Sequence, residues 1–478
     1  MNRITIHGDC GELTICRHIY GQFLEHTGRC VYGGAWVGLD SDIPNTRGWR
    51  NDVIEAMQAI NVPNIRWPGG NFAEAYHWRN GVGPVDQRPK LPGETNEVGT
   101  HEFMDYCDIL DCEPYICVNF LSGSCREAAE WLAYMTSDGD DPEAQLRRAN
   151  GRSQPWRVPM WVIGNEIMTV MTVEYFANMF NHWRRYLDGE FVVACGPNHE
   201  NYAWTDAIMA LAGDRADALA MHYYTIPGPW ADKGETIGFP EEDWYITFKK
   251  TWFTDELIAN HSAIMDRYDP DKRVKIVIDE WGTWYNRDKG VSITWQQNTL
   301  RDAVMAGVSL NIFNNRCDRV LMTNISQVVN ILQALILTDD DNRRMLRTPT
   351  YHVFEMFKVH QDATLLPTET ACGTYAVGGE GIEAVSVSAS RDGDGDGKVH
   401  VSLVNIDPNG DQAITCELRG IAATRVSGRI LAAEAMDEHN TFDEPDRLVP
   451  TEFTGATLAG ETLSVKLPAK SVVVLELT

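Results

Sequence analysis

The strongest constraint on the fold is an alternation of two kinds of segment between Arg17 and about His360. Short apolar or β-branched segments are each followed by an amphipathic stretch with helical periodicity. This order is typical of repeated βα units around a parallel sheet. Eight such units predict an α/β fold, the (β/α)8 or TIM barrel. The predicted strands are His18–Leu24, Asn64–Trp67, Pro114–Asn119, Met160–Gly164, Phe191–Cys195, Ala218–His222, Lys275–Asp279 and Arg319–Met322.

The amphipathic stretches between these strands are predicted as helices. Thr172 and Thr254 are predicted N-caps, because a threonine side chain can accept a hydrogen bond from a free backbone N–H of the first turn. The clearest predicted helices are Trp49–Ile60, His101–Leu110, Arg126–Met135, Val173–Leu187, Thr254–Tyr268, Leu300–Phe313 and Tyr351–His360.

The pattern changes after about Gln361, where helical periodicity disappears. Alternating apolar segments are separated there by Gly, Asp and Pro clusters, which is typical of an antiparallel, jelly-roll-like β-sandwich. We expect the opening segments Arg3–Ile6 and Glu12–Ile15 to pair with this sandwich rather than with the barrel. The predicted division is residues 1–16 for these N-terminal strands, 17–360 for the barrel and 361–478 for the sandwich, with clear strands at Val399–Val404, Ala413–Leu418 and Ser464–Leu467.

Charge and cysteine content exclude several classes of protein. The chain has 68 acidic and 41 basic residues, and its formal net charge of −27 repels nucleic acid phosphates and anionic lipid surfaces. No segment has the ~18 uncharged apolar residues of a membrane span, and the first residues do not resemble a secretory signal. We therefore expect neither a nucleic acid nor a membrane partner. Cys112, Cys117 and Cys195 lie in apolar segments and are predicted as buried thiols, which fits a reducing cytoplasm.

The sequence predicts neither a metal nor a cofactor. Cys107, Cys112 and Cys117 follow one another at intervals of five residues, which fits no zinc site. Arg391–Lys398 resembles a calcium-binding loop but lacks the glutamate at its twelfth position and lies between predicted strands, so we predict a solvated hairpin tip. The motifs of serine hydrolases, zincins, P-loop proteins and CxxC oxidoreductases are absent from the sequence as well.

Three glutamates follow apolar predicted strands: Glu25, Glu166 and Glu280. In a (β/α)8 barrel the catalytic groups lie where the strands end and the βα loops begin. A single carboxylate at such a place has a structural alternative, since it can pair with an arginine or cap a helix. Three carboxylates at the same rim favour chemistry.

Two carboxylates across one bond are what glycoside hydrolysis requires, and a spacing of roughly 5 Å gives retention of configuration. Asn165 precedes Glu166, and its amide can bind a sugar hydroxyl beside the anomeric carbon, so Glu166 suits the acid/base. Arg66 ends the second predicted strand and can keep a nearby carboxylate ionised, so Glu280 suits the nucleophile. Glu166 must then carry a proton while Glu280 is ionised, and it must act as a base in the second step.

Other polar residues are predicted near the same rim: Asn71, His222, Tyr224 and Gln333. Each has a structural alternative, such as shaping a turn for Asn71 or a satisfied internal histidine for His222. Aromatic side chains can stack on sugar faces, but about half of those near the predicted rim are expected to belong to the core. These aromatic residues are Trp67, Trp78, Trp281, Trp284 and Tyr285.

An ordered set of motifs resembles glycoside hydrolase family 51, the intracellular α-L-arabinofuranosidases. The resemblance covers nearly the whole chain. The motifs are GQFLEHTGRCVYGG (21–34), NIRWPGGNFAEAYHWRNGVGP (64–84), IGNE (163–166), IDEWGTWYN (278–286), QQNTLRDAVMAG (296–307) and VVNILQALILTD (328–339).

This resemblance implies a role for each matching residue. Glu166 matches the acid/base of a retaining double displacement, and Glu280 matches its nucleophile. Arg66 matches an arginine that supports the nucleophile. The residues that match those holding the arabinofuranose are Glu25, Asn71, Asn165, Tyr224 and Gln333. The resemblance further implies a C-terminal β-sandwich, a homo-oligomer (trimer or hexamer), and hydrolysis of terminal non-reducing α-L-arabinofuranosyl residues from arabinan- or arabinoxylan-type oligosaccharides.

One departure from the family pattern concerns specificity. Similar family members carry a Trp- and Gly-rich loop directly after the catalytic Asn-Glu, whereas residues 167–176 here are shorter and lack both residue types. The segment 225–243 also differs and is a candidate to close the site in another way. Two alternatives stay open: the same retaining chemistry on a β-xyloside or β-glucan, and a catalytically silent carbohydrate-binding protein.

Overall fold

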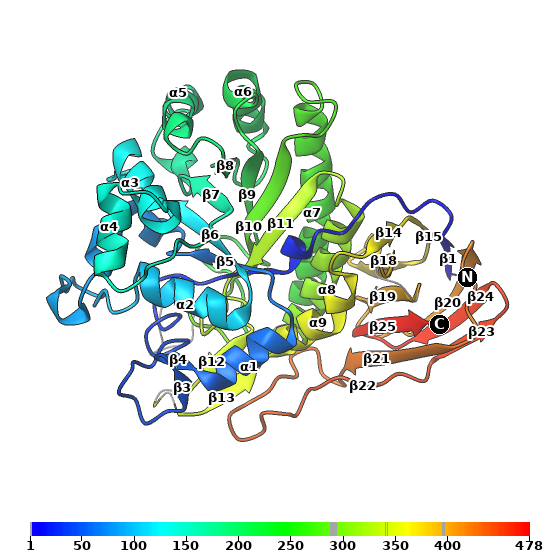
Figure 1. The fold of residues 1–478 in the computed structure, drawn as a ribbon. Helices are drawn as coiled ribbons and strands as arrows, with labels where there is room; N and C mark the ends of the chain where they lie inside the picture. Colours follow the sequence, from blue (N-terminus) through cyan, green and yellow to red (C-terminus); the bar gives the residue numbers. More distant parts are fainter. Residues whose placement is uncertain (1, 287–293, 340, 342, 394–396) are drawn as a thin grey trace.

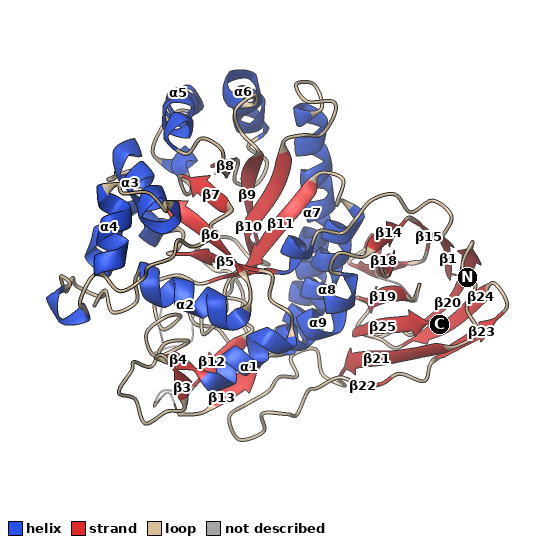
Figure 2. Ribbon diagram, in the orientation of Figure 1, coloured by secondary structure: helices blue, strands red, loops and turns tan. Residues whose placement is uncertain are grey.

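The computed structural model describes residues 2–286, 294–339, 341, 343–393 and 397–478. It contains a closed barrel and a C-terminal sheet domain that packs against one side of the barrel (Figure 1). Helices surround the barrel strands, while the second part consists almost entirely of strands (Figure 2). The predicted fold class is confirmed.

All eight predicted strands form the barrel, which closes in the order β10-β11-β2-β5-β6-β7-β8-β9 with parallel pairing. The first prediction, His18–Leu24, was too long, because residues Arg17–Tyr20 form a 3-10 helix and only the last part is a strand. The observed bounds are β2 Gly21–Phe23, β5 Asn64–Trp67, β6 Glu113–Val118, β7 Met160–Ile163, β8 Phe191–Ala194, β9 Ala218–Thr225, β10 Lys275–Thr283 and β11 Val320–Ile325.

Inward-facing side chains fill the barrel, so it is a packed core and not a channel. Alternate residues of neighbouring strands, such as Cys117, Val162 and Val193, belong to this interior cluster. Cys117 and Cys195 are buried, as predicted, whereas Cys112 is only half-buried because it lies just before β6. Each of the eleven cysteines has a free thiol.

Helices cover the outside of the barrel. Thr172 accepts a hydrogen bond from Tyr175 N and is the predicted N-cap of its helix. The observed helices are α1 Asn51–Ala59, α2 Thr100–Leu110, α3 Cys125–Thr136, α4 Pro142–Ala149, α5 Val173–Trp183, α6 Tyr202–Ala212, α7 Glu241–Met265, α8 Leu300–Asn315 and α9 Pro349–Phe357. None of the helices in the described ranges is long and apolar enough to cross a bilayer.

The predicted start of α7 was wrong. Thr254 lies buried in the middle of this helix, which begins thirteen residues earlier at Glu241 with Pro240 as its N-cap. The first turn carries Glu241, Glu242 and Asp243, which interact favourably with the helix dipole. These charges and the preceding proline are helix-start signals, which apolar periodicity alone does not detect.

The C-terminal sheet domain has a five-stranded sheet, β15-β1-β20-β24-β23, and a six-stranded sheet, β14-β18-β19-β25-β21-β22. The first strand of the chain, β1 (Asn2–His7), pairs in parallel with β20 and antiparallel with β15, and the other pairings in the two sheets are antiparallel. The remaining bounds are β14 Thr364–Leu366, β15 Thr368–Ala371, β18 Val385–Arg391, β19 Val399–Asn405, β20 Gln412–Arg419, β21 Val426–Ala432, β22 Thr451–Glu452, β23 Ala456–Ala459, β24 Thr462–Leu467 and β25 Ser471–Leu477.

The N-terminal prediction was therefore correct for Arg3–Ile6 but not for Glu12–Ile15, where only Thr14 makes an isolated bridge to Thr364. The predicted hairpin tip Arg391–Lys398 does lie between β18 and β19, but residues 394–396 are outside the described part of the chain. Short two-stranded sheets complete the fold: β3 Asn45–Thr46 with β4 Trp49–Arg50, β12 Ile336–Thr338 with β13 Met345–Arg347, and β16 Thr374–Val377 with β17 Glu380–Glu383.

Helix α8 joins the two parts. It is buried along nearly its whole length, because one side faces the barrel and the other faces β18, β19 and β25. Asn311 donates to Ser386 Oγ (3.1 Å) and accepts from Ser402 Oγ (2.6 Å), which satisfies its amide in an otherwise apolar interface. Gly307 lies against Val404 and Val472, where a larger residue would push the sheet away. The barrel and the sheet domain thus share one core.

Candidate active site

The three predicted glutamates meet at the C-terminal rim of the barrel. Glu25 follows β2, Glu166 follows β7, and Glu280 lies inside β10, which extends past its predicted end. Strand β9 is also longer than predicted, so His222 and Tyr224 project from a strand instead of a loop. Regular strands hold catalytic groups more rigidly than loops do.

Glu280 is held by two donors. Arg66 Nη1 donates to its Oε1 (2.9 Å) and the Tyr224 hydroxyl donates to its Oε2 (2.9 Å). Ser326 Oγ lies 2.8 Å from the same tyrosine oxygen and can donate to it in turn. Only a tenth of the Glu280 side chain is exposed. A charged guanidinium and a phenol therefore favour one orientation of an ionised carboxylate.

The second glycine in WPGGN, Gly70, makes room for this carboxylate. A Cβ on Gly70 would lie 2.5 Å from Glu280 Oε1 and 3.3 Å from Asn165 Oδ1. The close approach of the carboxylate therefore favours a glycine at this position.

Glu166 lies on a strained backbone. Its φ and ψ are 47° and 35°, in the left-handed region that side chains other than glycine rarely adopt. Its side chain is 23% exposed and one oxygen lies 3.2 Å from His222 Nδ1. Oxygens of Glu166 and Glu280 lie within 4.8 Å of each other. This proximity agrees better with the roughly 5 Å between the carboxyl groups of retaining glycosidases than with the roughly 6.5–9.5 Å of inverting ones.

His222 lies between the acidic groups. Its Nδ1 is 3.2 Å from Glu166 Oε1 and 3.6 Å from Glu280 Oε2, and its Nε2 is 3.1 Å from Asp279 Oδ1. Burial lowers the pKa of His222, but the surrounding carboxylates outweigh burial and raise it to about 10. The imidazole is therefore a cation at neutral pH.

This cation affects its neighbours. Burial raises the pKa of Glu166, but the hydrogen bond and the charge of His222 outweigh burial and hold that pKa below its ordinary value. Asp279 is fully buried, yet its pKa is lowered because Arg66 and His222 outweigh burial. Its Oδ2 also accepts from the Tyr115 hydroxyl (3.0 Å). Asp279 thus provides the negative charge that keeps Arg66 and His222 in place beneath the site.

Glu25 and His222 lie on opposite sides of Glu280 around the barrel, because β9 with His222 is on one side of β10 and β2 with Glu25 is on the other. Its Oε1 accepts from Gly70 N (2.9 Å) and its Oε2 accepts from Gln327 Nε2 (2.9 Å). Burial, together with the negative charge of Glu280, raises the pKa of Glu25. Asn71 is exposed, and its Oδ1 accepts from Asn165 Nδ2 (3.2 Å). Both side chains are thus fixed at the rim with oxygen atoms available to sugar hydroxyls.

Asn165 is the most heavily constrained amide in the site. Its Oδ1 accepts from Arg66 Nη2 (2.6 Å), and its backbone N–H donates to Glu74 Oε1 (2.6 Å). Glu74 also accepts from Phe120 N (2.9 Å) and Leu121 N (2.7 Å), and burial raises its pKa to about 7. Glu74 was not predicted from the sequence. An acidic residue three positions after Asn71 in a short buried turn was the available signal.

Gln333 does not reach the carboxylates. It is fully buried, its Oε1 accepts from Thr283 N (2.8 Å), and its Nε2 donates to Asp302 O (2.8 Å) and Thr350 Oγ1 (3.2 Å). These bonds use its amide to hold the end of β10, and they leave no donor for a sugar.

Most of the candidate aromatic residues belong to the core. Trp67, Trp78, Trp281 and Tyr285 are buried, so their faces pack against protein atoms. Trp284 is the exception: it is half-buried and its ring lies 5.3 Å from that of Tyr224. The core therefore contains more of these five aromatic residues than the half that was expected.

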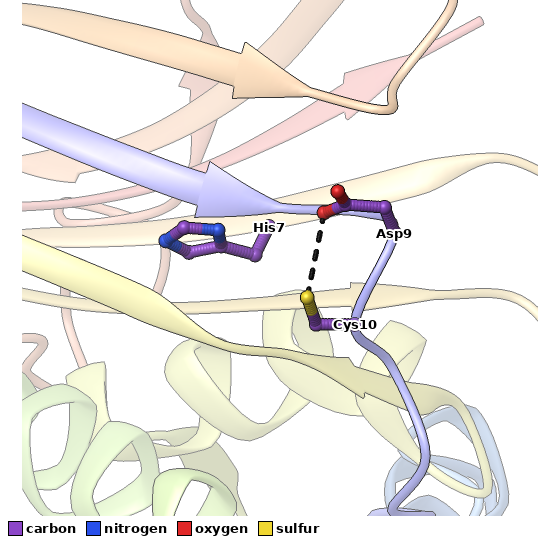
Figure 3. A group of neighbouring side chains, drawn as sticks. All are labelled: His7, Asp9 and Cys10. Carbon is purple, nitrogen blue, oxygen red and sulfur yellow. Dashed lines mark hydrogen bonds between the residues drawn. The ribbon is translucent and has the colours of Figure 1, made fainter.

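Two groups of side chains in the described ranges could hold a metal ion: Glu166 with His222 and Glu280, and His7 with Asp9 and Cys10. In the first group Arg66 and the His222 cation already neutralise the carboxylates. In the second, Asp9 accepts from Cys10 Sγ at 3.6 Å (Figure 3), and its charge raises the pKa of the Cys10 thiol. A metal ion in the first group would need a neutral His222, and one in the second group would need the Cys10 thiolate. Neither group therefore suits a metal ion.

Known proteins match this chain from end to end. Residues 56–236 match the family model of the α-L-arabinofuranosidase 1 domain, and residues 279–471 match that of the α-L-arabinofuranosidase C-terminal domain. An intracellular exo-α-L-arabinofuranosidase from Bacteroides ovatus is 44% identical, in an alignment that covers 99% of this chain and 95% of the relative.

Solved structures agree with these sequence matches. The family 51 arabinofuranosidase from Xanthomonas axonopodis pv. citri has a TM-score of 0.97 at 43% identity and covers 100% of this chain and 99% of its own. The α-L-arabinofuranosidase from Thermotoga maritima, solved with arabinose, has a TM-score of 0.88 at 29% identity, with 100% and 99% covered. This chain therefore belongs to glycoside hydrolase family 51, the family of the α-L-arabinofuranosidases.

Proposed function

We propose that the protein is a retaining exo-α-L-arabinofuranosidase that releases terminal non-reducing arabinofuranosyl residues from arabinose-containing oligosaccharides. The observation that carries this proposal is the pair Glu166 and Glu280, whose oxygens lie within 4.8 Å of each other at the rim of the barrel. Family membership supports the sugar, and the names of the relatives from Bacteroides ovatus and Xanthomonas axonopodis agree with it.

Glu280 is the proposed nucleophile. Arg66 and Tyr224 donate to its two oxygens, which fixes the carboxylate and leaves the remaining lone pairs for attack on the anomeric carbon. Attack produces a covalent glycosyl-enzyme ester. The Tyr224 hydroxyl can shift from the consumed carboxylate oxygen to the ring region of the sugar, because Ser326 still holds its position.

Glu166 is the proposed acid/base. In the free site His222 holds the pKa of Glu166 low, which suits the second step, where Glu166 takes a proton from water. The first step needs a proton on Glu166. Burial is the largest single influence on the pKa of Glu166. A sugar that fills the space between the carboxylates excludes water and so increases the burial of Glu166. Substrate binding therefore raises the pKa of Glu166 at the time when a proton is required.

Glu25, Asn71 and Asn165 are the proposed contacts to the arabinofuranose. Glu25 and Asn71 offer oxygens on one side of the rim, and the Asn165 amide is held beside Glu166 by Arg66 and Glu74. The role proposed for His222 is electrostatic, since it lies between both carboxylates. The role proposed for Gln333 is to hold the end of β10 rather than to contact the sugar.

Hydrolysis of p-nitrophenyl α-L-arabinofuranoside, with the matched β-xyloside and β-glucoside, tests the sugar. We expect turnover of the arabinofuranoside alone. Preference for another glycoside would keep the chemistry but reassign the sugar, and binding without turnover of any glycoside would favour a carbohydrate-binding protein.

Two variants test the proposed roles. Glu280→Ala should lose turnover of every substrate. Glu166→Ala should lose turnover of substrates with poor leaving groups while it keeps substantial activity on 2,4-dinitrophenyl arabinofuranoside, whose leaving group needs no proton. An equal loss on both kinds of substrate in Glu166→Ala would reject the acid role.

Three finer features belong to the same proposal. The two sheets of the C-terminal domain form a jelly-roll-like β-sandwich, which their strand orders support. The enzyme acts in the cytoplasm, which the intracellular relative supports. It assembles as a homo-oligomer, a trimer or hexamer, for which exposed apolar side chains such as Leu39 and Tyr175 supply surface; light scattering after gel filtration measures the size.

A further inference from the structure

Trp230 is a large aromatic side chain left exposed at the rim. It lies between β9 and α7, in a segment that leaves the C-terminal end of the barrel where Glu166 and Glu280 meet, and 64% of its surface is accessible. Most tryptophans in the described chain are buried, so this exposure needs a reason. Exposed aromatic rings beside a catalytic site are suited to stack on the apolar face of a ligand.

Aromatic contacts connect Trp230 to the proposed nucleophile. The rings of Trp230 and Trp284 pack in a T-shaped arrangement with their centroids 4.9 Å apart, and the centroids of the Trp284 and Tyr224 rings are 5.3 Å apart. The Tyr224 hydroxyl donates to Glu280 Oε2. Trp230 is thus connected to Glu280 through the aromatic side chains of Trp284 and Tyr224.

Lys233 adds a cation to this aromatic surface. Its Nζ lies 4.4 Å from the centroid of the Trp230 ring and 5.3 Å from that of Trp284. The same Nζ donates to Trp230 O (2.9 Å), so one of its three N–H groups is used and the others can donate to hydroxyl oxygens. An aromatic face that can stack and an ammonium that can donate hydrogen bonds to hydroxyl oxygens together suit a neutral sugar ring.

The segment is held in place before any ligand binds. Asn286 Oδ1 accepts from Lys233 N (2.9 Å), and its Nδ2 donates to Asp232 Oδ1 (2.7 Å). The backbone of Asn286 donates to Gly234 O (2.9 Å). These bonds fix the segment to the extension of β10. A preformed surface binds with less loss of conformational entropy than a mobile one.

The strand order places this surface on the side of the leaving group. Glu25 follows β2 and Asn71 follows β5, and β5 stands directly opposite β9 in the closed order. Glu166, the proposed donor of a proton to the leaving oxygen, follows β7, and β7, β8 and β9 are consecutive strands. A sugar attached to that oxygen therefore lies on the side of the rim where the segment with Trp230 leaves β9.

We propose that Trp230 and Lys233 form the binding site for the sugar residue that carries the arabinofuranosyl group. This inference rests on the proposed function and extends it to the leaving group: the occupant is a neutral sugar ring that stacks on Trp230 and accepts hydrogen bonds from Lys233. The surface discriminates between oligosaccharides and simple arabinofuranosides.

The test compares kcat/KM on an α-1,5-linked arabinofuranose disaccharide with kcat/KM on methyl α-L-arabinofuranoside, which has no second ring. We expect the ratio of the two values to fall roughly five- to tenfold in Trp230→Ala, the loss typical of one aromatic contact. Trp230→Phe should recover most of the ratio, because it keeps an aromatic face. Lys233→Ala should lower the ratio as well, since it removes the donors and a support of Trp230.

The control is Tyr186→Ala, which removes an exposed aromatic side chain of helix segment Arg184–Tyr186, outside the site. It should keep the wild-type ratio. A wild-type ratio in folded Trp230→Ala, verified by thermal denaturation, would overturn the inference while leaving the proposed function intact. Hydrolysis of neither substrate by the wild-type enzyme would reject both. A loss in Trp230→Ala that is equal on the two substrates would also overturn the inference.

Discussion

Replacing His222 with asparagine should move the alkaline limb of the pH profile upward. His222 is a cation below about pH 10 and lies 3.2 Å from Glu166 Oε1. Two unit charges at that distance interact by about 1.3 kcal/mol with the dielectric constant of water and by about 5 kcal/mol at an effective value of 20. Glu166 is partly exposed, so the lower figure is the safer bound. One pKa unit corresponds to about 1.4 kcal/mol.

The sign follows from the role of Glu166. Activity requires protonated Glu166 and falls as the pH rises through its pKa. The His222 cation favours the ionised carboxylate, so its removal raises the pKa of Glu166. We therefore expect the alkaline limb of kcat/KM on p-nitrophenyl α-L-arabinofuranoside to move up by at least about 1 pH unit.

His199→Asn is the matched control. His199 lies near His222 and donates its backbone N–H to His222 O, but burial lowers the pKa of its side chain. It is therefore neutral where the enzyme works, and its replacement removes no charge. An unchanged alkaline limb in His222→Asn, or an equal shift in His199→Asn, would refute the assignment of a charged His222 that controls Glu166.

Three further changes test how the site is held. Gly70→Ala places a Cβ 2.5 Å from Glu280 Oε1, so we expect kcat/KM of the folded variant to fall by about 100-fold or more; full activity would contradict the close approach. Glu74→Gln replaces an acceptor of three N–H groups, and kcat should fall by roughly tenfold, more on poor leaving groups than on activated ones, as steady-state kinetics on both would show. Thr172→Ala removes the N-cap of α5 and should lower the free energy of unfolding in urea by about 1 kcal/mol; an unchanged midpoint would mean that this cap contributes nothing.

The barrel could be predicted from the sequence because its strands are short apolar segments buried on both faces. Segments such as Asn64–Trp67 and Met160–Ile163 are separated by amphipathic helices, and that order has few other solutions. The start of α7 was missed because the buried positions of its first half include Thr247 and Thr251, so its buried face is not marked by apolar residues alone. The start of the helix was instead indicated by Pro240 and the acidic residues that follow it.

The proposed reacting pair, Glu166 and Glu280, was also accessible from the sequence, whereas the residues that support it were not. A glutamate at the end of an apolar strand is visible in the order of residues, and parallel strands bring such ends together. Glu74 accepts hydrogen bonds from backbone N–H groups of two separate segments, Phe120 with Leu121 and Asn165, an arrangement that only the folded chain creates. Gln333 was misplaced for the same reason: its position after the eighth strand suggested the rim, but its amide turns inward to Thr283 and Asp302.

The exposed Trp230 shows a further limit of reasoning from composition. Its segment, 225–243, has the Gly and Pro content of a loop, and nothing in the order of residues distinguishes Trp230 from a buried tryptophan such as Trp244. The distinction depends on Asn286, which lies more than fifty positions later in the chain and fixes the segment against β10.

Azide rescue of Glu166→Ala and Glu280→Ala tests the central claim most directly. Each variant is incubated with azide and 2,4-dinitrophenyl α-L-arabinofuranoside, and the anomeric configuration of the arabinofuranosyl azide is determined by NMR. In Glu166→Ala the covalent intermediate still forms and azide attacks it from the vacated side, so we expect the α-azide. In Glu280→Ala azide replaces the nucleophile, so we expect the β-azide. The reverse assignment, or the same anomer from both variants, would contradict a retaining mechanism with Glu280 as nucleophile and Glu166 as acid/base.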